Sequence, residues 1–292
     1  MVELKDYSSS VESAWCPGCG NFGILNAIKR ALVELDLAPH QVVIYTGIGQ
    51  AAKLPDYMNV NAFTSLHGRP IPIAQGAHLA NHGLKAIVHS GDGDTYGIGG
   101  NHFMHVMRRN ADVTIIAHNN LIYGLTKGQY SPTSPRGFQS KTSPPPEGAL
   151  ETPVNPLTWA LSAGATFVAR SFAGDMQHLI AMMVAAIEHK GVSLLDVFQP
   201  CVVFNPNYSY DFFRERVYRL EEEEGYDPSN RQAAWEKAQE WGDRLPIGIF
   251  YREEGRPTYE EQVPALRAGP LAERELRSWS EADYQALEAE FV

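Results

Sequence analysis

Residues 85–93 of the chain have the sequence KAIVHSGDG, and residues 112–120 have the sequence DVTIIAHNN. Each stretch begins with an apolar, β-branched run, which predicts a buried strand. A helix is expected between the two strands, within about residues 97–109. A strand, a helix and a second strand in this order form a βαβ unit, so the two strands are expected to lie parallel in one sheet.

The two strands end in polar residues with a shared chemistry. Asp92 and Asn120 offer oxygen ligands at the carboxyl ends of the strands, where parallel α/β sheets bind ligands. Mg²⁺ prefers such oxygens, and the N-terminus of a following helix favours phosphate. Gly91 and Gly93 lack a Cβ, so the backbone can approach the phosphates. The pattern therefore predicts a site for Mg²⁺ and a diphosphate, the alternative being a surface turn and a loop tip.

Strands and helices alternate through most of the remaining chain. Helices are expected near residues 21–35, 74–81, 155–164 and 175–190, and strands near 41–46, 166–170 and 193–199. This alternation predicts an α/β fold with a mostly parallel sheet and helices on both faces. The proline-rich segment 128–153 is expected to be a functional or disordered loop.

Composition divides the chain into two expected parts. An α/β domain is predicted over residues 1–207, where the strand and helix pattern lies. Residues 208–292 are expected to form a C-terminal extension that packs on the core or on a partner, because the tail is rich in Glu, Arg and Trp and shows no regular strand pattern.

The overall composition excludes several classes of protein. The chain has 292 residues, 44% of them hydrophobic and 20% charged, which is ordinary for a soluble enzyme. A net charge of −10 argues against a nucleic-acid partner. No apolar run is long enough for a transmembrane helix, so no membrane association is expected. The first residues lack a signal-peptide core, and we therefore expect a cytoplasmic protein.

The chain has three cysteines, Cys16, Cys19 and Cys201. An odd number without a secretory signal argues against a disulfide framework. Two thiolates spaced as Cys-x-x-Cys can bind one metal, as in iron–sulfur or zinc sites, and Cys201 follows a predicted strand that could bring a third thiolate. The alternatives are a redox dithiol or buried cysteines. A polar arm precedes the pair, which argues against a thioredoxin-like motif.

Five stretches together resemble a known family. They are WCPGCGNFGIL (15–25), GIGQAAKLPDY (47–57), LHGR (66–69), GDGDTYGIGGNHFMHVMRRN (91–110) and NNLIYGLTKGQYSPTSP (119–135). In this order they resemble the β subunit, which binds thiamine diphosphate (ThDP), of 2-oxoacid:ferredoxin oxidoreductases. The 2-oxoglutarate type is the most similar, and the resemblance covers roughly residues 10–265. It implies a ThDP-binding α/β fold.

The resemblance also implies a set of cofactor ligands. In that family Mg²⁺ is held by the Asp of GDG, the second Asn of NN and a carbonyl two residues later, which correspond to Asp92, Asn120 and Ile122. The remaining expected cofactor contacts are Gly91, Gly93, Asp94, Gly124, Leu125, Thr126 and Lys127.

Three residues are expected to act on the substrate or beside the cofactor. The resemblance places Lys53 near a substrate carboxylate, although a solvated lysine is an equal alternative. Arg69 can clamp a carboxylate through two parallel hydrogen bonds. His67 corresponds to a residue on the cofactor side, the alternative being a histidine hydrogen-bonded in the core.

The resemblance further implies a [4Fe–4S] cluster held by the three cysteines. The family normally has a fourth cysteine after its Gly-Ile-Gly turn, and this chain has Gln50 there. Iron–sulfur clusters generally take four thiolates. The fourth ligand is then Gln50 or Asp56, or the cluster has three irons, or the site is labile or empty.

The implied activity is oxidative decarboxylation of a 2-oxoacid, with 2-oxoglutarate expected, to acyl-CoA and CO₂. Coenzyme A takes the acyl group, and single electrons pass through the cluster to ferredoxin. In the family the carboxylate that activates ThDP comes from another subunit, so an α (or fused γα) subunit is the expected partner. The alternatives are a ThDP-dependent decarboxylase or carboligase without electron transfer, and a non-catalytic scaffold subunit.

Overall fold

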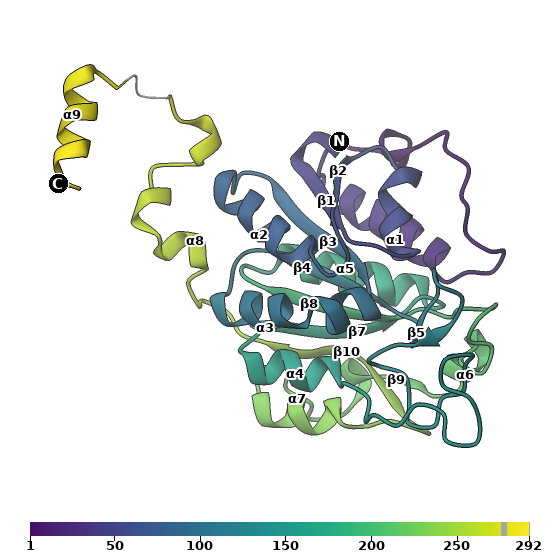
Figure 1. Cartoon of the computed structure of the whole chain (residues 1–292). Helices are drawn as coiled ribbons and strands as arrows, with labels where there is room; N and C mark the ends of the chain where they lie inside the picture. Colours follow the sequence, from purple (N-terminus) through teal and green to yellow (C-terminus); the bar gives the residue numbers. More distant parts are fainter. Residues whose placement is uncertain (276–278, 292) are drawn as a thin grey trace.

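A computed structural model describes residues 1–275 and 279–291. Its centre is an eight-stranded sheet with the order β2-β1-β3-β4-β8-β7-β10-β9 (Figure 1). The strands are β1 (Val42–Thr46), β2 (Asn61–Thr64), β3 (Lys85–Gly91), β4 (Thr114–Asn119), β7 (Phe167–Phe172), β8 (Ser193–Phe198), β9 (Val217–Arg219) and β10 (Leu245–Arg252). The strands from β2 to β7 in this order are parallel, whereas β10 is antiparallel to β7. The predicted mostly parallel sheet is confirmed.

Helices cover both faces of this sheet (Figure 1). One face carries α1 (Asn21–Glu34) and α5 (Met176–Glu188), which share one apolar core with the sheet. The other face carries α2 (Pro70–Ala80), α3 (Gly100–Arg109), α4 (Pro156–Ala163) and α7 (Arg231–Ala238). The remaining α-helices described are α6 (Tyr210–Arg214), α8 (Tyr259–Gln262) and α9 (Glu281–Ala289). Among the residues described, no helix is long and apolar enough to cross a membrane.

The βαβ unit predicted from the two quoted stretches is present. Strands β3 and β4 are apolar runs because helices cover both of their faces. Gly91 pairs with His118, so the two strands end level with each other. The connection differs from the single helix expected, because a π-helical segment, Gly93–Ile98, precedes α3. Asp92 and Asn120 therefore follow neighbouring strands, and both lie at the carboxyl end of the sheet.

The expectation that the chain beyond residue 208 contributes no strands was wrong. Strands β9 and β10 join the main sheet, and Leu245, Ile247 and Phe250 are buried. Burial on both faces removes the alternation that marks a half-buried strand, while Pro246 and Gly248 interrupt the run. After β10 the chain passes through α8, whose Glu260 is buried, and α9 then lies away from the body in the yellow segment of Figure 1. The domain boundary at residue 207 remains a prediction.

The proline-rich segment 128–153 packs against the end of the βαβ unit. It begins with β6 (Gln129–Tyr130), which pairs antiparallel with β5 (Ile122–Tyr123). It returns to the core where the amide of Val154 donates to the carbonyl of Pro132, over 2.7 Å. Between these points it places hydroxyl side chains at the end of β3. The segment therefore helps to hold the end of β3 in place.

Candidate functional site

A pocket of about 180 Å³ lies at the carboxyl ends of β1, β3 and β4. It is lined by many of the residues singled out from the sequence, namely His67, Gly91, Asp92, Gly93, Asp94, Asn120, Ile122, Gly124, Leu125 and Thr126. Ile48 and Gln50, from the turn after β1, also line it. The two sequence landmarks therefore converge on one concave site.

Three other predicted residues do not line this pocket. The guanidinium of Arg69 lies 2.6 Å from Nε2 of His102 on α3. Lys127 has a left-handed backbone, with φ of 78°, just beyond the pocket wall. Lys53 lies in the 3-10 helix Ala51–Tyr57, and its side chain is half-buried. Their predicted roles remain predictions.

Asp92 is fixed by hydroxyl groups from the proline-rich segment. Its Oδ2 accepts hydrogen bonds from Ser131, over 2.5 Å, and from Thr133, over 2.6 Å. Only 1% of Asp92 is exposed, and this burial raises the pKa of its carboxyl to about 6, although the two hydroxyls favour the charged form. A cation beside Asp92 would compensate the buried charge that this pKa reflects.

Asn120 is held by a local turn and by a neighbouring strand end. Its Oδ1 accepts from the amide of Ile122, over 3.1 Å, and its Nδ2 donates to Gln199, over 2.9 Å. Leu121, between them, has a left-handed backbone with φ of 61°, which reverses the chain. Asn119 instead points inward and donates to the buried carboxylate of Asp196, over 3.1 Å. Only the second Asn of the pair lines the pocket.

Asp94 links the end of β3 to the loop that carries His67 and Gly68. It accepts from Ser90, over 2.5 Å, and from the amide of Gly68, over 2.6 Å, and it contacts Nδ1 of His67. A Cβ on Gly47 would lie 1.9 Å from Oδ2 of Asp94, so that position requires glycine. Asp94 thus fixes His67 against the pocket, which the sequence did not predict.

A second pocket, of about 60 Å³, adjoins the first. Cys16, Cys19, Cys201 and Gln50 all line it, together with Trp15. None of the three cysteines forms a disulfide in the described structure. Burial raises the pKa of Cys19 to about 11, and the neighbouring thiols of Cys201 and Cys16 add to the rise. A bound metal would reverse this shift, because it stabilises the thiolate.

Gln50 occupies a defined place in this second pocket. Its backbone carbonyl accepts from the indole of Trp15, over 2.9 Å, which fixes the turn after β1. Its side-chain Oε1 is buried and has no hydrogen-bond partner among the described residues. Buried polar atoms are rarely left unpaired. This carbonyl oxygen is therefore available to a group bound among the three thiols.

The two pockets share a wall made of Gln50, Asn120 and Gly124. Gln199 joins them further, because it accepts from Asn120 and its Nε2 lies 3.6 Å from Sγ of Cys19. Gln199, like Ser131 and Thr133, was missed in the sequence. The available signals were the motif SPTSP for Ser131 and Thr133, and a place two residues before Cys201 for Gln199, but neither indicates a contact with Asp92 or Asn120.

The rim of the first pocket is apolar and exposed. Ile48 is 43% exposed and Leu125 is 44% exposed, and both line the pocket. Leu66, beside His67, is 75% exposed, and Ile98 is 53% exposed. A group of large apolar side chains around a polar pocket is typical of a surface that a partner covers.

Comparison with known proteins identifies two family models along the chain. Residues 40–197 match the C-terminal TPP-binding domain of thiamine pyrophosphate enzymes, and residues 201–268 match the C-terminal part of the pyruvate ferredoxin oxidoreductase beta subunit. The first match covers both landmarks of the first pocket. The second begins at Cys201 and includes β9 and β10.

Individual relatives agree with these models. The chain is 47% identical over 269 residues to "2-oxoacid:ferredoxin oxidoreductase 1, subunit beta" of Aeropyrum pernix, covering 89% of this chain and 84% of the relative. It is 45% identical over 221 residues to "2-oxoglutarate oxidoreductase subunit KorB" of Mycobacterium tuberculosis, covering 74% and 58%.

A solved structure with a similar fold is 2-oxoglutarate:ferredoxin oxidoreductase from Magnetococcus marinus, with 2-oxoglutarate, coenzyme A and succinyl-CoA bound. The match has a TM-score of 0.89 and 36% sequence identity, and it covers 98% of this chain and 96% of the matched chain. The family resemblance found in the sequence is confirmed.

Proposed function

The chain belongs to the β subunits of 2-oxoacid:ferredoxin oxidoreductases, and from this premise we propose that it binds ThDP with Mg²⁺ in the first pocket and an iron–sulfur cluster in the second. The observation that carries the proposal is the wall that the two pockets share, through Gln50, Asn120 and Gly124. A ThDP enzyme that transfers no electrons to a metal cluster would have no need of three thiols in a pocket beside its coenzyme.

The residues of the first pocket fit a diphosphate and its metal. Asp92, Asn120 and the carbonyl of Ile122 would hold Mg²⁺, since all three supply oxygen ligands. No atom of the described residues lies within 4 Å of the place where a Cβ of Gly91 would be, so the backbone there is open to a phosphate. When bound, ThDP supplies the reactive carbon for decarboxylation and the cluster accepts electrons one at a time. Calorimetry of ThDP with and without Mg²⁺ tests this site, and Asp92→Ala should abolish the Mg²⁺ dependence.

The second pocket fits an iron–sulfur cluster with an unusual fourth position. Three thiols meet there, and the unpaired Oε1 of Gln50 offers the fourth donor. We assign a [4Fe–4S] cluster held by Cys16, Cys19 and Cys201. Iron and acid-labile sulfide analysis with electron paramagnetic resonance of anaerobic protein tests this assignment. Zinc alone, or no metal, would favour the decarboxylase or carboligase alternative, for which the missing fourth cysteine is the supporting observation.

The proposed substrate is 2-oxoglutarate, because the relative from Mycobacterium tuberculosis and the Magnetococcus marinus structure are named for it. Lys53 and Arg69 are proposed to pair with its carboxylates, and His67 to lie beside the cofactor. Lys127 is proposed to offset phosphate or substrate charge. Coenzyme A is the proposed acyl acceptor and ferredoxin the electron acceptor. Steady-state kinetics with pyruvate and 2-oxoglutarate would show which substrate has the larger kcat/KM.

An α (or fused γα) subunit is the proposed partner that completes the site. The exposed rim of Ile48, Leu66, Ile98 and Leu125 supports this, since water-facing apolar groups around a pocket favour association. The chain alone should not decarboxylate 2-oxoglutarate with viologen as electron acceptor, whereas the complex should. Turnover by the isolated chain would contradict the two-subunit proposal. A cytoplasmic location remains a prediction.

A further inference from the structure

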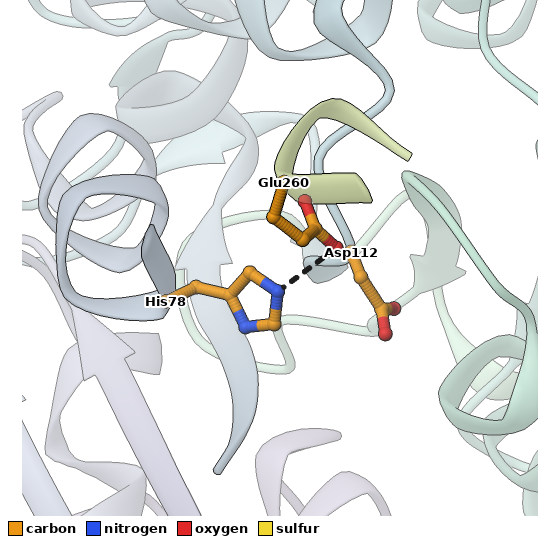
Figure 2. Close-up of side chains that lie close together, drawn as sticks. All are labelled: His78, Asp112 and Glu260. Atoms are coloured by element: carbon orange, nitrogen blue, oxygen red, sulfur yellow. Dashed lines mark hydrogen bonds and ion pairs between the residues drawn. The ribbon is translucent and has the colours of Figure 1, made fainter. Parts of the chain in front are cut away.

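A second cluster of side chains that could bind a metal lies at the opposite end of the sheet, beside the amino end of β4. It consists of His78 on α2, Asp112 just before β4 and Glu260 on α8 (Figure 2). Asp112 precedes the amino end of β4, whereas Asn120 follows its carboxyl end, and six strand residues span roughly 20 Å. The cluster is therefore separate from the two pockets described above and independent of the proposed function.

The three side chains converge from different parts of the chain. Nε2 of His78 lies 3.1 Å from Oε1 of Glu260, and one oxygen of Asp112 lies within 4.8 Å of both ligand atoms. Figure 2 shows the imidazole edge of His78 facing the Glu260 carboxylate, with the Asp112 side chain beside them. Ligand atoms around a tetrahedral metal lie about 3.4 Å apart, given bonds of about 2.0–2.1 Å. Small side-chain rotations would bring the three atoms to that geometry.

The cluster is buried and its hydrogen bonding is incomplete. His78 is 4% exposed and Glu260 is 8% exposed. Oε2 of Glu260 and Nδ1 of His78 have no hydrogen-bond partner within the described structure. Nδ1 of nearby His82 is also buried and unpaired, and its ring lies 6.5 Å from that of His78. Three unpaired polar atoms this close together are unusual in a protein interior.

The charges at the cluster leave room for a further cation. Lys85 lies 3.6 Å from Asp112 and is the one ammonium paired there among the described residues. The two carboxylates thus share Lys85 and the imidazole of His78, which carries a charge only when it is protonated. Buried carboxylates are normally paired or bound to a metal. Oε2 of Glu260 has no partner within the described structure, so this carboxylate is only partly satisfied.

We propose that His78, Asp112 and Glu260 bind a divalent transition-metal ion, with Zn²⁺ as the ion that imidazole and carboxylate ligands favour. The remaining coordination position is taken by water or by His82. Because Glu260 follows β10 and the other two ligands belong to the α/β core, the ion clamps the C-terminal segment onto that core. The site is structural, because His78 and Glu260 are buried and the side chain of Asp112 is only 16% exposed.

Zinc binding to the full chain tests the proposal, provided that the cysteines are excluded as ligands. A C16S/C19S/C201S variant removes the thiols, and Glu260→Gln then removes one carboxylate charge with little change in shape. Glu273→Gln, on the exposed part of the C-terminal segment, is the charge-matched control. After metal removal and addition of Zn²⁺, the thiol-free chain and its Glu273→Gln form should retain one equivalent. Glu260→Gln should weaken Zn²⁺ binding by at least 10-fold.

A second measurement applies if the thiol-free chain does not fold. In the anaerobic complex with its cluster assembled, added Co²⁺ should give a visible spectrum without thiolate charge-transfer bands, and Glu260→Gln should remove that spectrum. Zn²⁺ should also slow proteolysis of the segment after β10 in the unsubstituted protein and not in Glu260→Gln. Equal Zn²⁺ retention by both Gln variants, or no thiol-independent binding, would show that His78 and Glu260 form only an ion pair.

Discussion

Replacement of Thr133 by Val should weaken Mg²⁺ binding in a way that depends on pH. The Thr133 hydroxyl donates to Asp92 over 2.6 Å, and Asp92 is almost fully buried. A hydrogen bond to a charged group contributes about 1.5–3 kcal/mol. Its loss destabilises the carboxylate relative to the neutral acid, which raises the pKa of Asp92 by about one to two pH units.

The size of the effect follows from the starting pKa of Asp92, which burial raises to about 6. At pH 7 such a group is roughly 90% ionised, and after the substitution it would be about 50% to 10% ionised. If Mg²⁺ binds Asp92 as proposed, it competes with the proton for the carboxylate, so its apparent affinity should fall about 2- to 10-fold at pH 7. At pH 9 the carboxylate is ionised in both proteins, so the difference should largely disappear.

Calorimetric titration of Mg²⁺ in the presence of ThDP, at pH 7 and pH 9, measures this difference. Thr133→Ser is the matched control, because it keeps the hydroxyl and should bind like the unsubstituted chain at both pH values. The reasoning is refuted if Thr133→Val binds as tightly as Thr133→Ser at pH 7. A loss of equal size at pH 9 would also refute it, since that result would indicate a displaced loop and not a protonated carboxyl.

Three further outcomes are expected. Gln50→Cys should add a fourth thiolate to the pocket of the three cysteines, so the proposed cluster should survive air exposure longer. Iron content and electron paramagnetic resonance would follow its loss. An unchanged rate of loss would exclude Gln50 from the fourth ligand position. Arg170→Met should lower the free energy of unfolding by about 3–5 kcal/mol, because it leaves the fully buried Asp196 carboxylate without its ion pair, and denaturant titration should show it. Leu66→Glu should weaken binding of the proposed α subunit at least 10-fold in surface plasmon resonance, whereas Leu271→Glu, elsewhere on the surface, should not. Equal effects of the two substitutions would place the partner elsewhere.

The parts of the fold that the sequence revealed are those with a local signature. Strands β3 and β4 are continuous apolar runs ending in GDG and NN, so both the elements and their polar ends could be recognised. Strand β10 could not be recognised, because Pro246 and Gly248 weaken its strand pattern. Gly248 has φ of 124° where the side chain of Glu221 approaches, a tertiary reason for glycine that the strand's own sequence does not indicate.

The residues of the site also divide into those that a local sequence signal reveals and those that none does. Asp92 and Asn120 were identifiable because each follows its strand directly, and the three cysteines because thiols at such a spacing suggest a metal. Ser131 and Thr133 were not, because the 39 and 41 residues that separate them from Asp92 give no periodic signal. Asp196, which accepts from Asn119, lies within an apolar strand. Its other partners, Arg170 and Tyr96, come from distant parts of the chain, so the sequence does not reveal them.

The hydrogen bonds around Gln199 suggest why the two proposed cofactor sites have a common wall. One side-chain amide accepts from Asn120, a proposed Mg²⁺ ligand, and approaches Sγ of Cys19, a proposed cluster ligand. Any shift of the end of β8 would therefore move a ligand of each cofactor together. Cys201 continues the same strand end, and Gln199 also bonds the carbonyl of Pro200, over 2.8 Å. The end of β8 thus supports both the pocket proposed for ThDP and the pocket proposed for the iron–sulfur cluster.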